Sequence, residues 1–228
     1  MTNGTKIYTP PLGYDWLTPV YDTAIGALTR EHVWRSAFIK QIDPSPDDRI
    51  LDVGCGTGTL AVALKQMAPQ ADIIGIDPDR HALARAAAKA NAESQTLRFV
   101  EGFLSESVLP KRWTPTKIIS SLVFHQMPLA TKREILQTMS SLLAKNGVIH
   151  IADYGLQQSV LMRTLFRSTV QMLDGVADTQ SNADGILPEL MAEAGFVVEN
   201  TRIVPTPTGA ISLFRAMPRF DHKSPEVE

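Results

Sequence analysis

The sequence of 228 residues has few of the features that mark several large protein classes. Its single cysteine, Cys55, rules out a disulfide within the chain and argues against a cysteine-based metal site. No run reaches the roughly 20 apolar residues that a membrane-spanning helix needs. Basic charge is not in excess either, because 22 Lys and Arg residues stand against 24 Asp and Glu residues, a net charge of −2. This balance argues against a nucleic-acid partner, for which a basic face is expected.

The remaining composition is that of a globular domain. The chain is 44% hydrophobic and 20% charged, which is ordinary for a protein that buries a core. Residues 1–11 are polar, contain two prolines, and lack the apolar centre of a secretory signal. With the lone cysteine, this predicts a cytoplasmic protein. The length and the absence of a repeat or low-complexity linker predict one domain.

Strand-like and helix-like segments alternate along the chain. The predicted strands are residues 49–53, 72–76, 97–100, 117–121, 148–152, 196–204 and 210–216. The predicted helices are residues 31–41, 59–68, 80–92, 131–144, 160–173 and 186–194. Such alternation indicates βαβ units, and therefore an α/β fold with a mostly parallel sheet covered by helices on both faces. The last two strands are close enough in sequence to pair antiparallel.

The most informative segment is RILDVGCGTGT, residues 49–59. A predicted strand runs into a turn that contains Gly54, Gly56 and Gly58, and a predicted helix follows. Glycine permits positive φ and a close approach of a ligand to the main chain, and a helix N-terminus offers unpaired N–H groups. The next predicted strand leads into Asp77, whose carboxylate is suited to ribose hydroxyls. The pattern predicts a nucleoside-containing ligand at the carboxyl ends of these two strands.

Two nucleoside cofactors fit this description. The dinucleotide fingerprint G-x-G-x-x-G requires a third glycine where Thr59 stands. The observed spacing G-x-G-x-G, preceded by an acidic residue, instead resembles the class I S-adenosylmethionine-dependent methyltransferases. Four further segments resemble that family in order and spacing: GIDPD at 75–79, FVEGF at 99–103, IISSLVFHQMP at 118–128 and LAKNGVIHIADYG at 143–155.

The resemblance implies a fold and a domain plan. It implies a Rossmann-like sheet of seven strands, mostly parallel with one antiparallel C-terminal strand, and helices on both faces. It implies one methyltransferase domain over residues 1–218, with an N-terminal helical lid at 1–46 and a cap insertion at 156–187. Residues 219–228 are expected to be a mobile tail because they contain little that could pack.

The resemblance also implies the residues that hold S-adenosylmethionine. The glycines of the loop would bind the methionine part through main-chain groups, and Asp52 would order the loop or meet the amino group through water. Asp77 would bridge the ribose hydroxyls. Phe103 stands where many relatives have an Asp that bonds the adenine, so stacking and main-chain contacts would recognise adenine here. The implied set is Tyr14, Tyr21, Asp52, Gly54, Cys55, Gly56, Gly58, Asp77, Pro78, Gly102, Phe103 and Ser121.

Two residues are candidates for catalysis. His125, in the loop after the fourth predicted strand, could act as a general base or orient the acceptor, and a structural role fits it as well. Tyr21 lies in YDWLTPVYD, residues 14–22, which resembles the lid of the ubiquinone/menaquinone-biosynthesis-like branch of the family. A tyrosine ring attracts a cation such as a sulfonium, and simple packing of an aromatic helix is the alternative.

These features predict methyl transfer to a small, apolar acceptor without a metal. Alignment of the acceptor and exclusion of water are the main requirements. The apolar stripe within 155–187 fits a core, a homodimer face or a ligand cavity. Two alternatives remain: a non-catalytic module that binds S-adenosylmethionine, and a nicotinamide-dependent oxidoreductase, since fold does not fix function.

Overall fold

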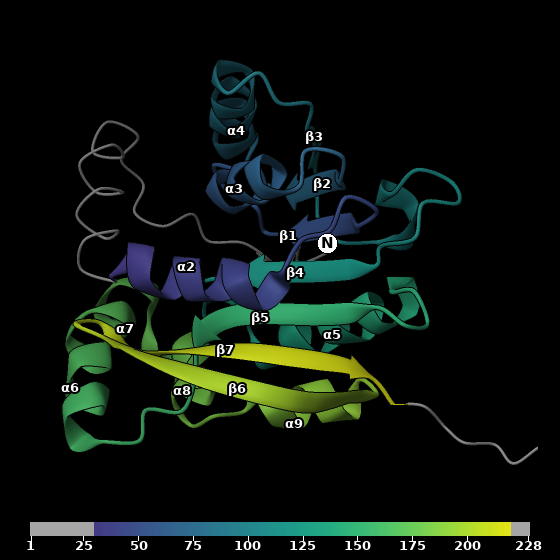
Figure 1. Cartoon of the computed structure of the whole chain (residues 1–228). Coiled ribbons are helices and arrows are strands. Elements are labelled where there is room, and N and C mark those ends of the chain that lie inside the picture. The colour runs from purple at the N-terminus through teal and green to yellow at the C-terminus, as the bar shows by residue number, and fades with distance from the viewer. Residues whose placement is uncertain (1–29, 220–228) are drawn as a thin grey trace, which may run out of the picture.

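The computed structural model describes residues 30–219, which form one seven-stranded sheet with helices around it (Figure 1). The strands are β1 (Arg49–Val53), β2 (Asp72–Asp77), β3 (Arg98–Glu101), β4 (Lys117–Ser121), β5 (Val148–Tyr154), β6 (Phe196–Thr206) and β7 (Gly209–Pro218). Their spatial order is β3-β2-β1-β4-β5-β7-β6, and β7 runs antiparallel to both of its neighbours. The other neighbouring pairs are parallel. The predicted fold class is confirmed.

Helices cover both faces of this sheet. The elements are α2 (Glu31–Ile42), α3 (Thr59–Met67), α4 (Arg80–Ala92), α5 (Leu129–Leu142), α6 (Val160–Ser168), α7 (Val170–Asp174), α8 (Val176–Ala183) and α9 (Leu187–Glu193), with short 3₁₀ turns η1 (Glu106–Val108) and η2 (Phe124–Gln126). Helices α2 and α3 pack on one face, with α4 beside α3, and α5 and α9 pack on the other. In Figure 1, α6 and α7 lie at the end of the sheet toward which β4 and β5 point.

The core is split into two layers by the alternation of side chains along the strands. In β1, Ile50 belongs to the cluster under α2 and α3, and Leu51 belongs to the cluster under α5 and α9. Both side chains are fully buried. A strand buried on both faces reads as a continuous apolar run, which is why the strand RILDV was predictable.

The 156–187 segment differs most from the sequence prediction. The predicted helix 160–173 is interrupted at Thr169, whose φ of −120° and ψ of −80° are not helical. Helix α8 was not predicted, because two of its three buried residues, Thr179 and Asn182, are polar and hide the apolar periodicity. The predicted apolar stripe is only partly buried: Phe166 is 1% exposed, whereas Val160 is 82% exposed.

The C-terminal hairpin is longer than predicted. Pro205 and Thr206 continue β6 and pair with Ala210 and Gly209, so the turn is confined to Pro207 and Thr208. The prolines suggested a longer connection. Because β6 is an edge strand, however, a residue without an N–H group is tolerated within it.

Parts of the predicted domain plan lie outside the described residues. Of the N-terminal lid at 1–46, residues 31–42 form α2, which packs on the sheet, and residues 1–29 are not described. All but Arg219 of the predicted tail at 219–228 is also outside them. Within residues 30–219, none of the helices has the length and apolarity needed to cross a membrane.

Candidate active site

A cavity of about 440 Å³ opens at the carboxyl ends of β1, β2 and β4. The loop after β1, the ends of β2 and β4, the turn after β3, and helices α2, α4 and α5 all contribute to its wall. Eight residues of the predicted cofactor set line it: Gly54, Cys55, Gly56, Asp77, Pro78, Gly102, Phe103 and Ser121. Asp52 and Gly58 lie directly beside lining residues in the chain. The structure therefore brings together most residues that the sequence singled out.

The three loop glycines all have positive φ but meet different surroundings. Their φ angles are 71° at Gly54, 52° at Gly56 and 70° at Gly58. A Cβ on Gly54 would lie 2.4 Å from Cγ2 of Val123, and one on Gly58 would lie 2.7 Å from Cβ of Ala86. A Cβ on Gly56 would meet nothing within 4 Å. Gly54 and Gly58 are thus required for packing, and Gly56 exposes main chain to the cavity.

Asp77 joins the end of β2 to this loop. Its Oδ2 accepts a hydrogen bond of 2.8 Å from the N–H of Gly56, and its Oδ1 accepts one of 2.9 Å from the N–H of Asp79. Burial raises the pKa of Asp77, and these two donors oppose that rise. Each carboxylate oxygen has two lone pairs, so Asp77 can accept further bonds from hydroxyl groups in the cavity.

Asp52 is buried beside the cavity without a hydrogen-bond partner. Its side chain is 1% exposed, and neither oxygen has a partner among the described residues. Burial and the charge of Asp77 raise the pKa of Asp52 to about 7, and the charge of Arg35 opposes this rise. Buried polar groups are almost always paired in proteins, so an unpaired carboxyl group indicates a missing partner.

Arg35 and Trp34 of α2 also line the cavity, and sequence reasoning missed both roles. Arg35 forms an ion pair with Glu31, and its Nε is buried without a partner among the described residues. Burial lowers the pKa of Arg35 to about 10, and it stays protonated at neutral pH. Both residues lie in the predicted helix 31–41, and no sequence motif marks either as a cavity residue.

The loop after β4 is held in a strained conformation. Leu122 lines the cavity and has a φ of 56°, a conformation that costs a residue with a Cβ about 1–2 kcal/mol. The next two N–H groups, of Val123 and Phe124, donate to Oδ2 of Asp153 at 2.9 and 2.7 Å. Asp153, at the end of β5, thus fixes the loop that forms one wall of the cavity.

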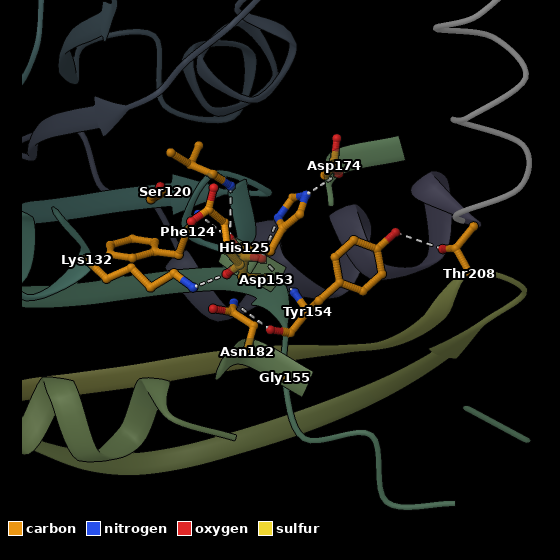
Figure 2. Close-up of polar contacts among 12 residues, drawn as sticks. Ser120, Phe124, His125, Lys132, Asp153, Tyr154, Gly155, Asp174, Asn182 and Thr208 are labelled. Carbon is orange, nitrogen blue, oxygen red and sulfur yellow. Dashed lines mark hydrogen bonds and ion pairs between the residues drawn. The ribbon is translucent and has the colours of Figure 1, made fainter. Parts of the chain in front are cut away.

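His125 follows in η2, but it is not among the residues that line the cavity. Its side chain lies instead in a buried cluster of polar groups (Figure 2). Its Nδ1 lies 2.8 Å from Oδ1 of Asp153 and its Nε2 lies 3.5 Å from Oδ2 of Asp174. Burial alone would lower the pKa of His125, but the two carboxylates outweigh it and raise the pKa to about 9. A base at the reacting centre needs access and a free lone pair at neutral pH, and His125 has neither.

The other candidate for catalysis, Tyr21, and the second lid tyrosine, Tyr14, lie outside the described residues. Within residues 30–219, no group of three or more His, Cys, Asp or Glu side chains is arranged to hold a metal ion.

Comparison with known proteins finds a family match for the part of the chain that contributes most of the cavity lining. A family model described as a methyltransferase domain matches residues 50–147. Over these residues the chain resembles the class I S-adenosylmethionine-dependent methyltransferases. Its cofactor is S-adenosylmethionine.

Named relatives of this methyltransferase domain include two demethylmenaquinone methyltransferases. The protein from Deinococcus radiodurans is 36% identical over 88 residues, which are 38% of this chain and 36% of that protein. The protein from Thermus thermophilus is 27% identical over 182 residues, or 72% of this chain and 81% of that protein. The chain thus matches about a third of the first relative's length and most of the second's.

A solved structure has the same fold as this chain. Magnesium protoporphyrin IX methyltransferase from Synechocystis, with S-adenosylmethionine bound, superposes with a TM-score of 0.62 at 16% identity. The superposition covers 94% of this chain and 88% of that one.

The residues of the methyltransferase domain fit the cofactor chemically. Asp52 is a buried acceptor without a partner, and Arg35 is a cation with an unpaired Nε, so together they complement an ammonium and a carboxylate group. Asp77 has free lone pairs for hydroxyl groups. The main chain at Gly56 is open to the cavity because no side chain covers it.

Exchanging single glycines for alanine should separate binding from folding. We expect Gly56→Ala to lower the free energy of unfolding by about 1–2 kcal/mol, the cost of its positive φ, and to weaken S-adenosylhomocysteine binding more than tenfold because its methyl group enters the cavity. We expect Gly54→Ala to cost about 1–3 kcal/mol more in stability through overlap with Val123. Calorimetry and urea denaturation measure the two effects. Unchanged binding by Gly56→Ala would contradict this placement of the ligand.

Proposed function

We propose that the protein transfers a methyl group from S-adenosylmethionine to a small organic acceptor. The observation that carries this proposal is that Asp77 and the open main chain at Gly56 line one cavity, and that the buried, unpartnered Asp52 directly precedes the lining residue Val53. In this assignment, Asp77 binds the ribose hydroxyls and the glycine loop binds the methionine part. Asp52 accepts from the ammonium group and Arg35 pairs with the carboxylate group.

The reaction then needs little acid–base chemistry from the protein. The sulfonium supplies a methyl group that is already activated. The chain contributes alignment of the acceptor and exclusion of water. His125, a candidate base from the sequence, is protonated and does not line the cavity. An acceptor that is already nucleophilic needs no base, and Tyr21 is then the remaining candidate for catalysis.

Two facts support a small organic acceptor. The relatives named demethylmenaquinone methyltransferase point to a small, apolar molecule. The net charge of −2 disfavours a nucleic-acid acceptor.

The exposed aliphatic side chains of α6 to α8 support the homodimer that the sequence suggested, for Leu161 and Met172 are 62% and 80% exposed. Sedimentation of the purified protein tests that state.

The proposed activity is tested by product analysis. The protein is incubated with methyl-labelled S-adenosylmethionine and a panel of quinols, phenols, amines and thiols, and S-adenosylhomocysteine and labelled product are measured by mass spectrometry. Labelled product formed by the natural chain and lost in Asp77→Ala is the expected result. Binding of both sulfur nucleosides without turnover on any acceptor would favour a non-catalytic module. Preferential binding of NADH would favour an oxidoreductase.

Cofactor binding should depend on pH through Asp52. An ammonium group prefers the ionised carboxylate, and the pKa of Asp52 is about 7, so a proton must leave Asp52 for tight binding below that pH. We expect affinity for S-adenosylhomocysteine to rise about fivefold from pH 6 to pH 8, within the roughly tenfold that one pKa unit allows.

Calorimetry in buffers of different ionisation enthalpy measures both the affinity and the released proton. The matched variant is Asp52→Asn, which keeps the shape of the side chain and cannot titrate. A pH dependence that survives in Asp52→Asn would assign it to another group.

A further inference from the structure

A cluster of buried charges connects the loop after β4, which lines the cofactor cavity, with helices α7 and α8. The proposed cofactor contacts do not use this cluster, whose side chains are drawn in Figure 2. It contains His125 of η2, Asp153 of β5, Lys132 of α5 and Asp174 of α7. His125, Asp153 and Lys132 are at most 3% exposed, and the Asp174 side chain is 18% exposed. Burying charges is costly unless each is paired, so the cluster needs an explanation.

On the cavity side, Asp153 holds the cofactor loop. Besides the N–H groups of Val123 and Phe124, it accepts from the N–H of Tyr154 at 2.8 Å and from His125 at 2.8 Å. Both oxygens are therefore fully engaged. The strained Leu122 precedes these donors, and the bonds to Asp153 keep the loop in its cavity-lining conformation.

On the far side, the same cluster reaches the helices of the 156–187 segment. His125 uses its second ring nitrogen toward Asp174, the last residue of α7. Lys132 donates to the carbonyl of Asp178 at 2.7 Å and to the Oγ of Ser181 at 2.8 Å, which ties α8 to α5.

The charged groups around His125 come from every element packed on it. They are the carboxylates of Asp153 and Asp174, the ammonium group of Lys132, which interacts with Asp153, and the carboxylate of Asp178, which interacts with Lys132. The ring of Tyr154 packs edge-on against the imidazole at 5.0 Å between centroids. His125 is the group that touches an anion on each side.

We propose that His125 is a positioning residue that links the loop lining the cofactor cavity to helices α7 and α8 through Asp153 and Asp174. A ligand that orders the loop then also orders α7 and α8, the segment predicted from sequence to cap the acceptor. This inference rests on the proposed cofactor site and is independent of the acceptor's identity.

The test is hydrogen exchange followed by mass spectrometry, with S-adenosylhomocysteine as the probe. In the natural chain we expect the ligand to slow exchange at least threefold in peptides covering 121–127 and in peptides covering 170–183. In Asp174→Asn, which removes the charge and keeps the side-chain shape, slowing should persist in 121–127 and fall below 1.5-fold in 170–183. Calorimetry should show an affinity within twofold of the natural chain.

Two further variants test whether the effect depends on the contact between His125 and Asp174. Asp184→Asn removes a carboxylate of the same segment that bonds Gln180 instead of His125, and it should behave as the natural chain does. His125→Asn keeps a donor toward Asp153 but cannot reach Asp174, so it should reproduce Asp174→Asn. Equal slowing of 170–183 in all variants would overturn the link. Failure of the natural chain to bind the probe in the calorimeter would remove the proposed function, and this inference with it.

Discussion

Replacing Asp77 with alanine should weaken S-adenosylhomocysteine binding by at least tenfold, which is about 1.4 kcal/mol. In the proposed site this carboxylate accepts from two ribose hydroxyls, and a hydrogen bond to a charged group contributes about 1.5–3 kcal/mol. The carboxylate also holds the N–H of Gly56 at 2.8 Å, so its loss loosens the loop that contacts the methionine part. Calorimetry with the purified protein measures the change.

Asp72→Asn is the matched control for this experiment. Asp72 begins the strand that Asp77 ends, and it pairs at the surface with Arg98 and Trp113, far from the cavity lining. It should leave the affinity unchanged. Equal affinity of Asp77→Ala and the natural chain would refute the ribose assignment, provided that both variants unfold at similar temperatures.

The stability of the protein should fall as the pH rises from 5.5 to 8, and His125 should account for about 2 kcal/mol of that fall. The pKa of His125 is about 9 in the folded chain and close to 6.5 in the unfolded chain. A raised pKa stabilises fully below the unfolded value, and this contribution is lost as the pH rises through the folded value. The full contribution is about 3 kcal/mol, since each pKa unit corresponds to about 1.4 kcal/mol.

Comparison with His125→Asn isolates this contribution from those of other groups. Asp52, with a pKa of about 7, also lowers stability with rising pH below that value, and it is present in both proteins. Burial lowers the pKa of Lys132 to about 8, which raises stability only at higher pH. Urea denaturation at pH 5.5 and 8 should therefore give a smaller decline in the variant. Identical declines would show that folding does not change the pKa of His125, which would contradict its raised value in the cluster.

The sheet and the glycine loop were predictable because their signals are local. RILDV is buried on both faces from residue 50 to residue 53, and the glycines at 54, 56 and 58 stand where the chain has positive φ. Asp77 follows from its place at the end of the next strand. In each case the residue and the sequence pattern that predicts its place lie within one short segment.

The buried cluster could not be predicted, because the residues that interact in it lie far apart in the chain. His125 and Asp153 are 28 residues apart, and only the pairing of β4 with β5 brings them together. Sequence spacing placed His125 on a loop facing the acceptor, whereas the two carboxylates turn it inward. Lys132 is fully buried although lysine is among the least buried residue types, and its partners in α8 belong to a helix without an apolar stripe. Arg35 was missed for the same reason, since its unpaired Nε is visible only beside Asp52.

Pro205 also affects whether the edge strands of two copies of this chain can pair. It lies in β6, the outermost strand on its side, and it has no N–H group to offer a neighbouring strand. At the opposite border, β3 is only four residues long, too short to template an added strand well. Within the described sheet, the proline near the end of one border strand and the short length of the other therefore both work against edge-to-edge pairing of two copies.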